Sequence, residues 1–413
     1  MRKISNCRVC QSKKIHPFFD LGKQPLANSL LKKANQKEKK YPLSLSWCKD
    51  CNLVQLNHTV DPKELFSNYV WVTGTSKTAK EYAKIFYNEM VSRFKSNDAE
   101  NYVLEIASND GTFLKPFIEN KYKTLGVDPA ENIVKVALKE GVPTEHMFFG
   151  VKAARKLLKG HGPAAVVFAR NVLPHVANTR DFIEGMKIVL KDDGVGAVEV
   201  HYADKILKEL HYDSIYHEHL CYFTVKSLEK LLNDFDLYIF DIIKSPISGG
   251  SIVVYFKKKK TREKVVVNQY RDKETIDKIN NFSSWKNFAR KSYFHRDKLI
   301  AIIKKINQDK KKIVGYGASA RSSTLLNFCG INSKMISAIA DQNHLKQNLF
   351  TAGSHILIEK PEKVIKRNPD YILILAWNFN QEIIENLENN LSFRGSYIIP
   401  LPNEPKIKFG CGK

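Results

Sequence analysis

No apolar run in this sequence of 413 residues approaches the roughly 20 residues that a helix needs to cross a bilayer. The amino-terminal stretch, MRKISNCRVC, also lacks the apolar core of a signal peptide. Without either segment, we expect a soluble, cytoplasmic protein. Hydrophobic residues still make up 43% of the chain, with 23 Phe and 17 Tyr, which favours two or three globular domains over disorder.

Basic residues are abundant, but no single segment gathers them together with aromatic residues. The net charge is +23, and such a surplus suggests a nucleic-acid partner. The lysines are instead spread along the chain in short runs such as 257–260 and 310–312. We therefore favour a solvated basic surface that attracts an anionic small substrate, with a nucleic-acid-binding face as the alternative.

Four of the seven cysteines form two close pairs, Cys7-x-x-Cys10 and Cys48-x-x-Cys51. Each pair can form a tight turn that presents both thiolates to one tetrahedral zinc ion. Disulfides are the weaker explanation in a cytoplasmic protein, and a redox motif is weaker still because two copies bracket one small region. Four thiolates leave no open coordination position, so we predict one structural zinc. The remaining cysteines are expected to be packing or surface thiols: Cys221, Cys329 and Cys411.

A nucleotide-binding layout follows in the middle of the chain. The stretches YVLEIA at 102–107 and TLGVDPA at 124–130 predict two strands, separated by a turn and a helix. Glu105 lies near the end of the first strand, and Asp128 lies 23 residues later at the end of the second. This layout is typical of a doubly wound nucleotide site, in which the second-strand carboxylate accepts hydrogen bonds from ribose hydroxyls.

The loop after the first strand is not the G-x-G-x-x-G of a dinucleotide site. It reads E-x-A-x-N-x-G from Glu105 to Gly111, which resembles the acidic glycine-rich loop of class I methyltransferases. An ordinary strand-turn-helix is the alternative. Further strands at 164–176 and 194–200 predict a Rossmann-like domain that binds its ligand at the carboxyl ends of the strands. Two polar residues lie just past one of those ends, Asn171 and His175.

The eight residues YHEHLCYF at 216–223 gather two histidines, a glutamate and two tyrosines. Such a cluster can hold a metal ion, transfer protons or form a polar turn. A metal site needs a third ligand besides two histidines on one face. The residues alone leave these alternatives open.

The last third of the chain contains a second strand-turn-helix pattern. Residues 261–309 are polar with helical spacing, and Gly315-x-Gly317-x-x-Ala320 then fits a dinucleotide fingerprint with Asp341 as its second-strand acid. The residues therefore allow an NAD site. Backbone amides of a glycine loop at a helix start suit a sugar diphosphate equally well.

Seven stretches, in order along nearly the whole chain, resemble the bacterial nucleotide-sugar C-methyltransferases that make branched deoxysugars. They are LGKQPLANSLL at 21–31, YPLSLSWCKDCNLVQL at 41–56, LEIASNDGTFL at 104–114, ARNVLPHVAN at 169–178, YHEHLCYF at 216–223, GYGASARSSTLLN at 315–327 and AWN at 376–378. The resemblance implies an α/β fold with a Rossmann-like class I methyltransferase domain over 76–258. It also implies a zinc-binding domain over 1–75 and a C-terminal α/β Rossmann-like domain over 259–413 that contributes to nucleotide-sugar binding.

The resemblance also implies a reaction. The expected substrate is a deoxysugar with a ketone at carbon four, linked to a nucleoside diphosphate, usually thymidine diphosphate. A base removes the proton from carbon three, and the enolate takes a methyl group from S-adenosylmethionine. The reaction needs a base whose pKa is near neutral and hydrogen-bond donors for the enolate oxygen.

Roles for individual residues follow from the matching motifs. His219 is the expected base, with Glu218 as the second candidate and Tyr216 and His175 as donors or positioning groups. The expected cofactor contacts lie at the carboxyl ends of the first strands: Glu105, Ala107, Asn109, Asp110, Gly111, Asp128, Pro129 and Asn171. The expected substrate contacts are Tyr69, Tyr222, Gly317, Ala318, Arg321 and Asn378.

The chain departs from the family pattern at three positions. Trp71 stands where members often have a tyrosine, and Ser248 and Val253 replace the histidine of an HGGS stretch and a following arginine. These departures favour a divergent substrate or a different methylated carbon. Other readings are an O- or N-methyltransferase, a basic zinc-containing nucleic-acid-binding protein and an NAD-dependent sugar reductase. We expect a monomer or weak oligomer, without a membrane partner.

Overall fold

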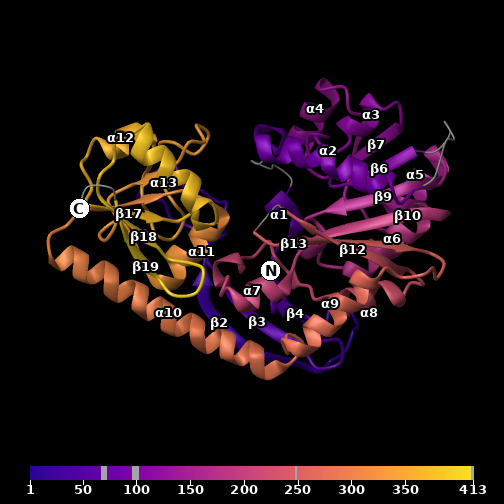
Figure 1. Cartoon of the computed structure of the whole chain (residues 1–413), viewed down its shortest axis with the longest axis horizontal. Coiled ribbons are helices and arrows are strands. Elements are labelled where there is room, and N and C mark those ends of the chain that lie inside the picture. Colours follow the sequence, from indigo (N-terminus) through magenta and orange to yellow (C-terminus); the bar gives the residue numbers. More distant parts are fainter. Residues whose placement is uncertain (67–71, 95–101, 247–248, 411–413) are drawn as a thin grey trace.

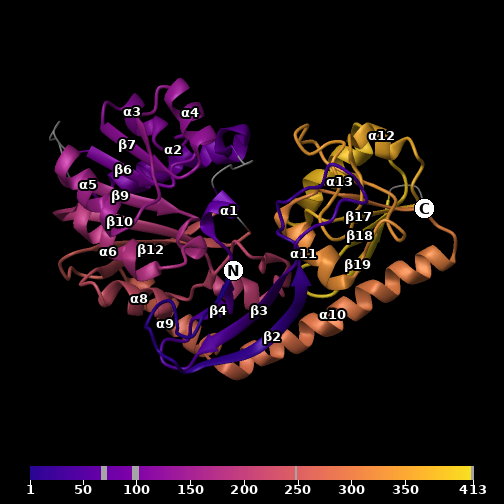
Figure 2. The same cartoon turned by 180° about the vertical axis from the view of Figure 1, so that it is seen from behind.

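The structure, a computed structural model, describes residues 1–66, 72–94, 102–246 and 249–410. Two α/β lobes stand side by side, and a small sheet from the N-terminal region lies below and between them (Figures 1 and 2). The long helix α10 (Phe282–Gln308) runs under this small sheet and on to the C-terminal lobe. No helix in the described ranges combines the length and apolar character needed to span a bilayer.

The first lobe is built on a seven-stranded sheet in the order β12-β13-β10-β9-β6-β7-β8. Five neighbouring strands are parallel, and β13 runs antiparallel to both β10 and β12. The order of the parallel strands reverses between β6 and β9, so a ligand is expected at the carboxyl ends of these two strands. The strand bounds are β6 (Tyr102–Ile106), β7 (Lys123–Asp128), β8 (Thr144–His146), β9 (Ala164–Arg170), β10 (Leu190–His201), β12 (Tyr238–Ser245) and β13 (Ser251–Lys257).

Helices cover both faces of this sheet because its central strands are apolar on both sides. They are α2 (Lys77–Val91), α3 (Lys115–Glu119), α4 (Glu131–Lys139), α5 (Val151–His161), α6 (Thr179–Val189), α7 (Ala203–Lys208) and α8 (Val225–Asn233). Three single turns join them: η1 (Thr73–Thr75), η2 (Leu173–His175) and η3 (Tyr212–Ser214). A capping box between Thr224 and Ser227 starts α8 directly after YHEHLCYF, which fixes where that stretch ends.

The N-terminal sheet has the strand order β11-β4-β3-β2. Its strands are β2 (Ile15–Gln24), β3 (Tyr41–Cys48), β4 (Val54–Leu56) and β11 (Cys221–Tyr222). A two-stranded ladder of β1 (Arg2–Lys3) and β5 (His58–Thr59) and the short helix α1 (Pro62–Phe66) complete this region. Strand β11 belongs to YHEHLCYF, so the edge strand of the N-terminal sheet comes from the middle of the chain.

The second lobe has a six-stranded sheet in the order β16-β15-β14-β17-β18-β19, parallel except for β19. Its strands are β14 (Ile313–Tyr316), β15 (Ile339–Ala340), β16 (Ile358–Glu359), β17 (Tyr371–Ile374), β18 (Ser396–Ile399) and β19 (Lys406–Phe409). The remaining helical elements are α9 (Val265–Ile276), α11 (Ala320–Cys329), α12 (Pro361–Ile365), η4 (Trp377–Phe379) and α13 (Asn380–Asn389). The domain boundaries predicted after residues 75 and 258 remain predictions.

Candidate active site

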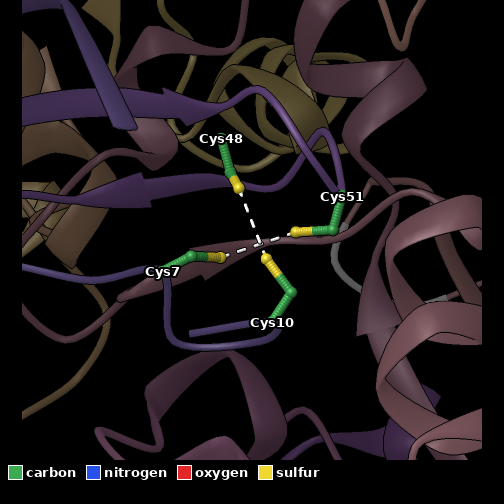
Figure 3. A group of neighbouring side chains, drawn as sticks. All are labelled: Cys7, Cys10, Cys48 and Cys51. Atoms are coloured by element: carbon green, nitrogen blue, oxygen red, sulfur yellow. Dashed lines mark hydrogen bonds between the residues drawn. The ribbon is translucent and has the colours of Figure 1, made fainter. Parts of the chain in front are cut away.

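The four cysteines predicted to bind zinc converge on one point (Figure 3). All four sulfur atoms lie within 4.8 Å of one another, and the Sγ atoms of Cys7 and Cys51 are 3.5 Å apart. A disulfide needs about 2.05 Å, whereas four thiolates at about 2.3 Å from one zinc lie about 3.8 Å apart. The geometry fits a zinc ion held by four thiolates.

The two Cys-x-x-Cys turns have the same backbone design. In each, the residue four after the first cysteine donates its N–H to that cysteine's carbonyl: Gln11 to Cys7 at 3.0 Å and Asn52 to Cys48 at 2.9 Å. Gln11 and Asn52 both have a φ near +60°. The strand order brings the second pair, between β3 and β4, beside the first.

Three acidic side chains gather around the loop after β6, one from β6, one from the loop and one from the end of β7. Glu105 is buried, and its Oε2 atom has no hydrogen-bond partner in the described part of the chain. Burial, with the nearby Asp110 and Asp128, raises the pKa of Glu105 well above its ordinary value, and Arg170 opposes this. Such a cluster is electrostatically suited to a ligand that carries positive charge.

Backbone geometry keeps this loop tight. Asp128 at the end of β7 accepts the N–H groups of Asn109 and Ala130 at 2.9 and 2.8 Å. Gly111 has a φ of +76°, and a Cβ atom there would lie 2.5 Å from the side chain of Val142. This position therefore requires glycine.

Two of the predicted cofactor residues hold a neighbouring segment. The side chain of Asn109 accepts the N–H of Thr73 at 2.9 Å, and Asp110 accepts the N–H of Gly74 at 2.8 Å. These bonds fix the turn η1 over the loop, directly before α2. Asn109 and Asp110 thus shape the site through residues that the sequence did not single out.

His219 is held by hydrogen bonds on both ring nitrogens. Nδ1 is 2.7 Å from the carbonyl oxygen of Ser214, and Nε2 is 2.7 Å from the hydroxyl of Tyr216. A carbonyl oxygen only accepts, so Nδ1 carries the proton and Nε2 of the neutral ring accepts from Tyr216. Burial, followed by His175, holds the pKa of His219 well below its ordinary 6.5, against the bond to Ser214. The ring is therefore neutral near pH 7 with its basic nitrogen identified.

Two further titratable groups adjoin His219. The ring of His175 lies 4.8 Å from that of His219, centroid to centroid, and burial lowers the pKa of His175 to about 4. Glu218 is buried and accepts the amide of Asn28 at 2.6 Å. Burial raises the pKa of Glu218 to about 7, although the bond from Asn28 opposes this. The cluster holds a neutral histidine pair beside a carboxyl that titrates near neutrality.

The C-terminal lobe meets this cluster at η3. The carboxylate of Asp213 accepts Nε and Nη2 of Arg321 at 3.0 and 2.8 Å, and Nε1 of Trp377 at 2.7 Å. The Nη1 atom of Arg321 faces Gly249, whose Cβ position would lie 3.7 Å away. Asp213 accepts Nε–H and one N–H of Nη2, so the predicted substrate contact by Arg321 would use Nη1 or the second N–H of Nη2.

In the glycine loop of the C-terminal lobe, as in the loop after β6, a backbone N–H is held by an aspartate at or directly after the end of the next strand along the chain. Gly317 has a φ of +96°, and Asp341 accepts the N–H of Ala318 at 2.7 Å. Lys346 donates to the carbonyl of Ala318 at 2.7 Å. Asn378 is exposed on η4. The structure places Gly317 and Ala318 at the start of α11, close in sequence to Arg321.

Three family models match consecutive parts of the chain. They are described as "Putative zinc binding domain" for residues 7–66, "Methyltransferase domain" for residues 79–241 and "C-methyltransferase C-terminal domain" for residues 246–402. The chain is also 31% identical to C-methyltransferase NovU from Streptomyces niveus over 411 residues, which cover 98% of this chain and 97% of that protein. This chain belongs to the C-methyltransferase family.

Two solved structures show the level of similarity to other methyltransferases. A SAM-dependent methyltransferase from Anabaena variabilis is 14% identical over 46% of this chain and 88% of its own, with a TM-score of 0.36. Magnesium protoporphyrin IX methyltransferase from Synechocystis, with bound SAM, is 11% identical over 44% of this chain and 80% of its own, with a TM-score of 0.33.

The C-methyltransferase assignment confirms the predicted family, fold class and cofactors. The enzyme depends on S-adenosylmethionine and contains a zinc-binding domain. The residues present fit both groups: four converging thiolates for zinc, and an acidic loop with the unpartnered Oε2 atom of Glu105 for a cationic methyl donor. Because the chain belongs to the C-methyltransferase family, the methyl acceptor is a carbon atom and not oxygen or nitrogen.

The structure places the four predicted catalytic residues in one region and turns two other residues of YHEHLCYF elsewhere. His219, Tyr216 and His175 form one contact cluster, next to Glu218. Tyr222 is buried in β11, and burial raises the pKa of its hydroxyl well above 10. His217, from the same stretch, faces the carbonyl of Tyr41 at 3.2 Å. Several positions singled out in the sequence lie outside the described residues: Tyr69, Trp71, Ser248 and Cys411.

Sequence reasoning missed four residues that the structure places at the site. Asn28 and Trp377 lie within motifs that support the family resemblance, LGKQPLANSLL and AWN, and these motifs were the available signal. Asp213 gave no such signal. His201, at the end of β10, has a buried Nε2 atom without a partner in the described ranges. Burial, followed by Arg321, holds the pKa of His201 well below its ordinary value.

Proposed function

We propose that this C-methyltransferase methylates a carbon beside the ketone of a nucleoside-diphosphate-linked 4-keto-deoxysugar, with carbon three as the acceptor. The observation that carries the proposal is the state of His219. Its Nδ1 proton is committed to Ser214, which leaves Nε2 as the basic nitrogen of a neutral ring. The Tyr216 hydroxyl, whose hydrogen bond Nε2 accepts, must turn toward the substrate to free the Nε2 lone pair. A carbon next to a ketone becomes a nucleophile only after it loses a proton, so the reaction requires a base here. Burial holds the pKa of His219 below the near-neutral range, which keeps Glu218, with a pKa of about 7, as the second candidate.

The proton step follows from the geometry of the cluster. Nε2 of His219 takes the proton from the carbon beside the ketone, the C–H bond breaks, and its electron pair moves toward the ketone oxygen. The resulting enolate is the carbon nucleophile. Once the Tyr216 hydroxyl has turned away from Nε2, it can donate its one hydrogen bond to the developing oxyanion. The neutral ring of His175, 4.8 Å from that of His219, is a second candidate donor. S-adenosylmethionine, when bound, supplies an electrophilic methyl group.

The site of the methyl donor adjoins this cluster in the sheet. Glu105 lies near the end of β6 and residues 107–111 follow it, and Asn171 and His175 follow β9, the neighbouring strand. We assign the cofactor to the loop after β6, with Asp128 as the ribose acceptor. Pro129 and Ala107 border the same edge.

The nucleotide portion is assigned to the junction with the C-terminal lobe. The N–H groups of Gly317 and Ala318 are bonded to Ala340 and Asp341. The phosphate oxygens are therefore assigned to the N–H groups of the first turn of α11, which follows this loop. The net charge of +23 adds long-range attraction for a diphosphate. Asn378 and the Nη1 atom of Arg321 are further candidate contacts at this junction.

Transfer of labelled methyl groups to a panel of dTDP-4-keto sugars tests the proposal directly. We expect transfer to one of them, and enzyme-dependent exchange of a ring proton with deuterated water beside the ketone. His219→Ala should abolish exchange and transfer together while calorimetry still shows S-adenosylmethionine binding. Absence of both sugar binding and label transfer across the panel would refute the proposed substrate.

A second variant tests whether the substrate proton passes directly to Nε2 of His219 or first to the oxygen of Tyr216. Tyr216→Phe removes the hydroxyl but leaves Nε2 in place, so we expect exchange to continue at a rate lowered by about 10-fold. A loss as complete as in His219→Ala would instead identify the Tyr216 oxygen as the first proton acceptor.

A further inference from the structure

We propose that the C-terminal lobe positions the catalytic base by clamping residues 213–215 of the methyltransferase lobe. This proposal rests on the proposed role of His219 and deepens it. The carbonyl of Ser214 accepts Nδ1–H of His219 at 2.7 Å. The two residues that flank Ser214 are both bonded to the other lobe. Arg321, Trp377 and Thr324 are therefore positioning residues for the base.

The first half of the clamp is the carboxylate of Asp213. Its side chain is only 1% exposed and receives three N–H groups: two from Arg321, at 3.0 and 2.8 Å, and one from Trp377, at 2.7 Å. The guanidinium of Arg321 also lies over the ring of Trp377, 4.7 Å from its centre. Two-point hydrogen bonding by arginine fixes the plane of the carboxylate as well as its distance.

The second half of the clamp is the carbonyl of Ile215. Thr324, one turn further along α11, donates its hydroxyl to this oxygen at 2.9 Å. The backbone is thus held on both sides of Ser214 by α11 and η4. The direction of the Ser214 carbonyl depends on residues from the C-terminal lobe.

That direction decides which nitrogen of His219 is basic. A neutral imidazole has two tautomers, and the acceptor opposite Nδ1 selects the one with Nε2 unprotonated. If the Ser214 carbonyl turned away, the ring could protonate on Nε2 and would then have no lone pair toward the substrate. The clamp therefore acts on the proton step and not on cofactor binding, which belongs to the loop after β6.

Two conservative variants loosen the clamp without removing its bulk. Arg321→Lys keeps the charge but loses the two-point contact, and Trp377→Phe keeps an aromatic ring but loses the N–H to Asp213. We expect both to lower ring-proton exchange and methyl transfer in parallel, by about 10- to 100-fold. The Kd for S-adenosylmethionine should stay within about threefold of wild type in both variants. In Trp377→Phe, which keeps Arg321, KM for the keto sugar should change less than kcat.

A matched control exists in the same molecule. Arg93 pairs with the buried Asp241 on the outer strand β12 and lies 4.3 Å from the ring centre of Tyr255. Arg93→Lys therefore disturbs an equivalent arginine-carboxylate-aromatic group away from residues 213–215. We expect it to lower thermal stability as Arg321→Lys does, while the exchange rate per folded enzyme stays at the wild-type value.

The pH profile of ring-proton exchange distinguishes a positioning role from a loss of stability, because a less stable enzyme keeps the same profile. The Ser214 contact raises the pKa of His219 against burial, His175 and Arg321. A loosened clamp should therefore shift the acid limb of the profile to lower pH in Trp377→Phe, in which all charged groups are retained. The proposal would be overturned if both clamp variants showed the wild-type exchange rate and the wild-type pH profile. Equal losses in Arg93→Lys would also overturn it, because they would reflect general destabilisation. If the wild-type enzyme itself shows no exchange, the proposed function fails instead.

Discussion

Single residues of the catalytic stretch are distinguished by their surroundings more than by their chemical type. Of the two histidines in YHEH, His217 faces the backbone of Tyr41 and His219 faces Ser214 and Tyr216. Only His219 also contacts the ring of His175. The same residue type thus packs against backbone at one position and, at the other, has the contacts of the proposed base.

Glu218 gives a pH-dependent prediction at this scale. Its pKa is raised to about 7 by burial, so the folded state holds this proton to higher pH than the unfolded state does. The free energy of unfolding therefore falls as pH rises from about 4.5 to about 7, and it does not recover at higher pH. Glu218→Gln keeps an oxygen for Asn28 and cannot ionise. We expect it to stabilise the enzyme by about 1–3 kcal/mol at pH 8 and by under about 1 kcal/mol at pH 5.

Denaturant titrations of both proteins at the two pH values provide the measurement. A stability difference that is the same at pH 5 and pH 8 would show that Glu218 does not titrate near neutrality in the folded enzyme.

At the scale of elements, the edge strand β11 joins the zinc region to the catalytic stretch. Cys221 and Tyr222 pair with Gln55 and Val54 of β4, four residues or fewer after Cys51. The first cysteine turn is docked independently: Thr179, at the start of α6, donates to the carbonyl of Arg8 at 2.6 Å. A zinc ion that performs no chemistry therefore still supports the strand that ends YHEHLCYF.

We predict that removing one zinc ligand lowers activity through this strand. In Cys48→Ser, metal analysis should show loss of the zinc, and limited proteolysis should cut the N-terminal region faster. Methyl transfer should fall by at least about 10-fold, while calorimetry should show unchanged binding of S-adenosylmethionine. Cys329→Ser, which alters a buried thiol away from the cluster, is the control and should keep its zinc. Full activity in a zinc-free variant would contradict the support role.

At the scale of the whole molecule, the N-terminal region also reaches the C-terminal lobe. Leu31 pairs with Phe350, and Glu38 accepts the N–H of Gly353 at 2.9 Å and approaches Nε2 of His355 at 3.0 Å. Asn28, which holds Glu218, lies at the start of the same connection. One segment therefore touches both lobes.

This connection should weaken at alkaline pH. The pKa of His355 is raised, first by its bond to the carbonyl of Ala34 and then by Glu38. For a histidine with a raised pKa, the stabilisation is complete below about 6.5 and is lost as pH rises through the folded value. Because His355 is partly exposed, Glu38→Gln should cost only about 0.5 kcal/mol at pH 6 and almost nothing at pH 8.5.

Thermal melting of wild type and Glu38→Gln across this range measures the difference. A cost that persists at pH 8.5 would assign the stabilisation to the bond from Gly353 and not to the charge of His355.

Local patterns in the sequence predicted a large part of this enzyme. The Cys-x-x-Cys pairs predicted the four-sulfur cluster, and the spacing from Glu105 to Asp128 predicted the strand-loop-strand unit of the first lobe, because both patterns act over short distances along the chain. The prediction of α9 and α10 rested in the same way on helical spacing. The motif order then gave the family, which full-length similarity confirmed.

The sequence by itself therefore determined the elements, the family and the candidate groups of YHEHLCYF. Only the tertiary structure distinguishes the surroundings of these groups, because burial shifts their pKa values and hydrogen bonds from distant segments hold the residues around them. Asn28 reaches Glu218 across 190 positions and Arg321 reaches Asp213 across 108. No periodicity or spacing encodes such contacts, since they exist only after three sheets have packed together.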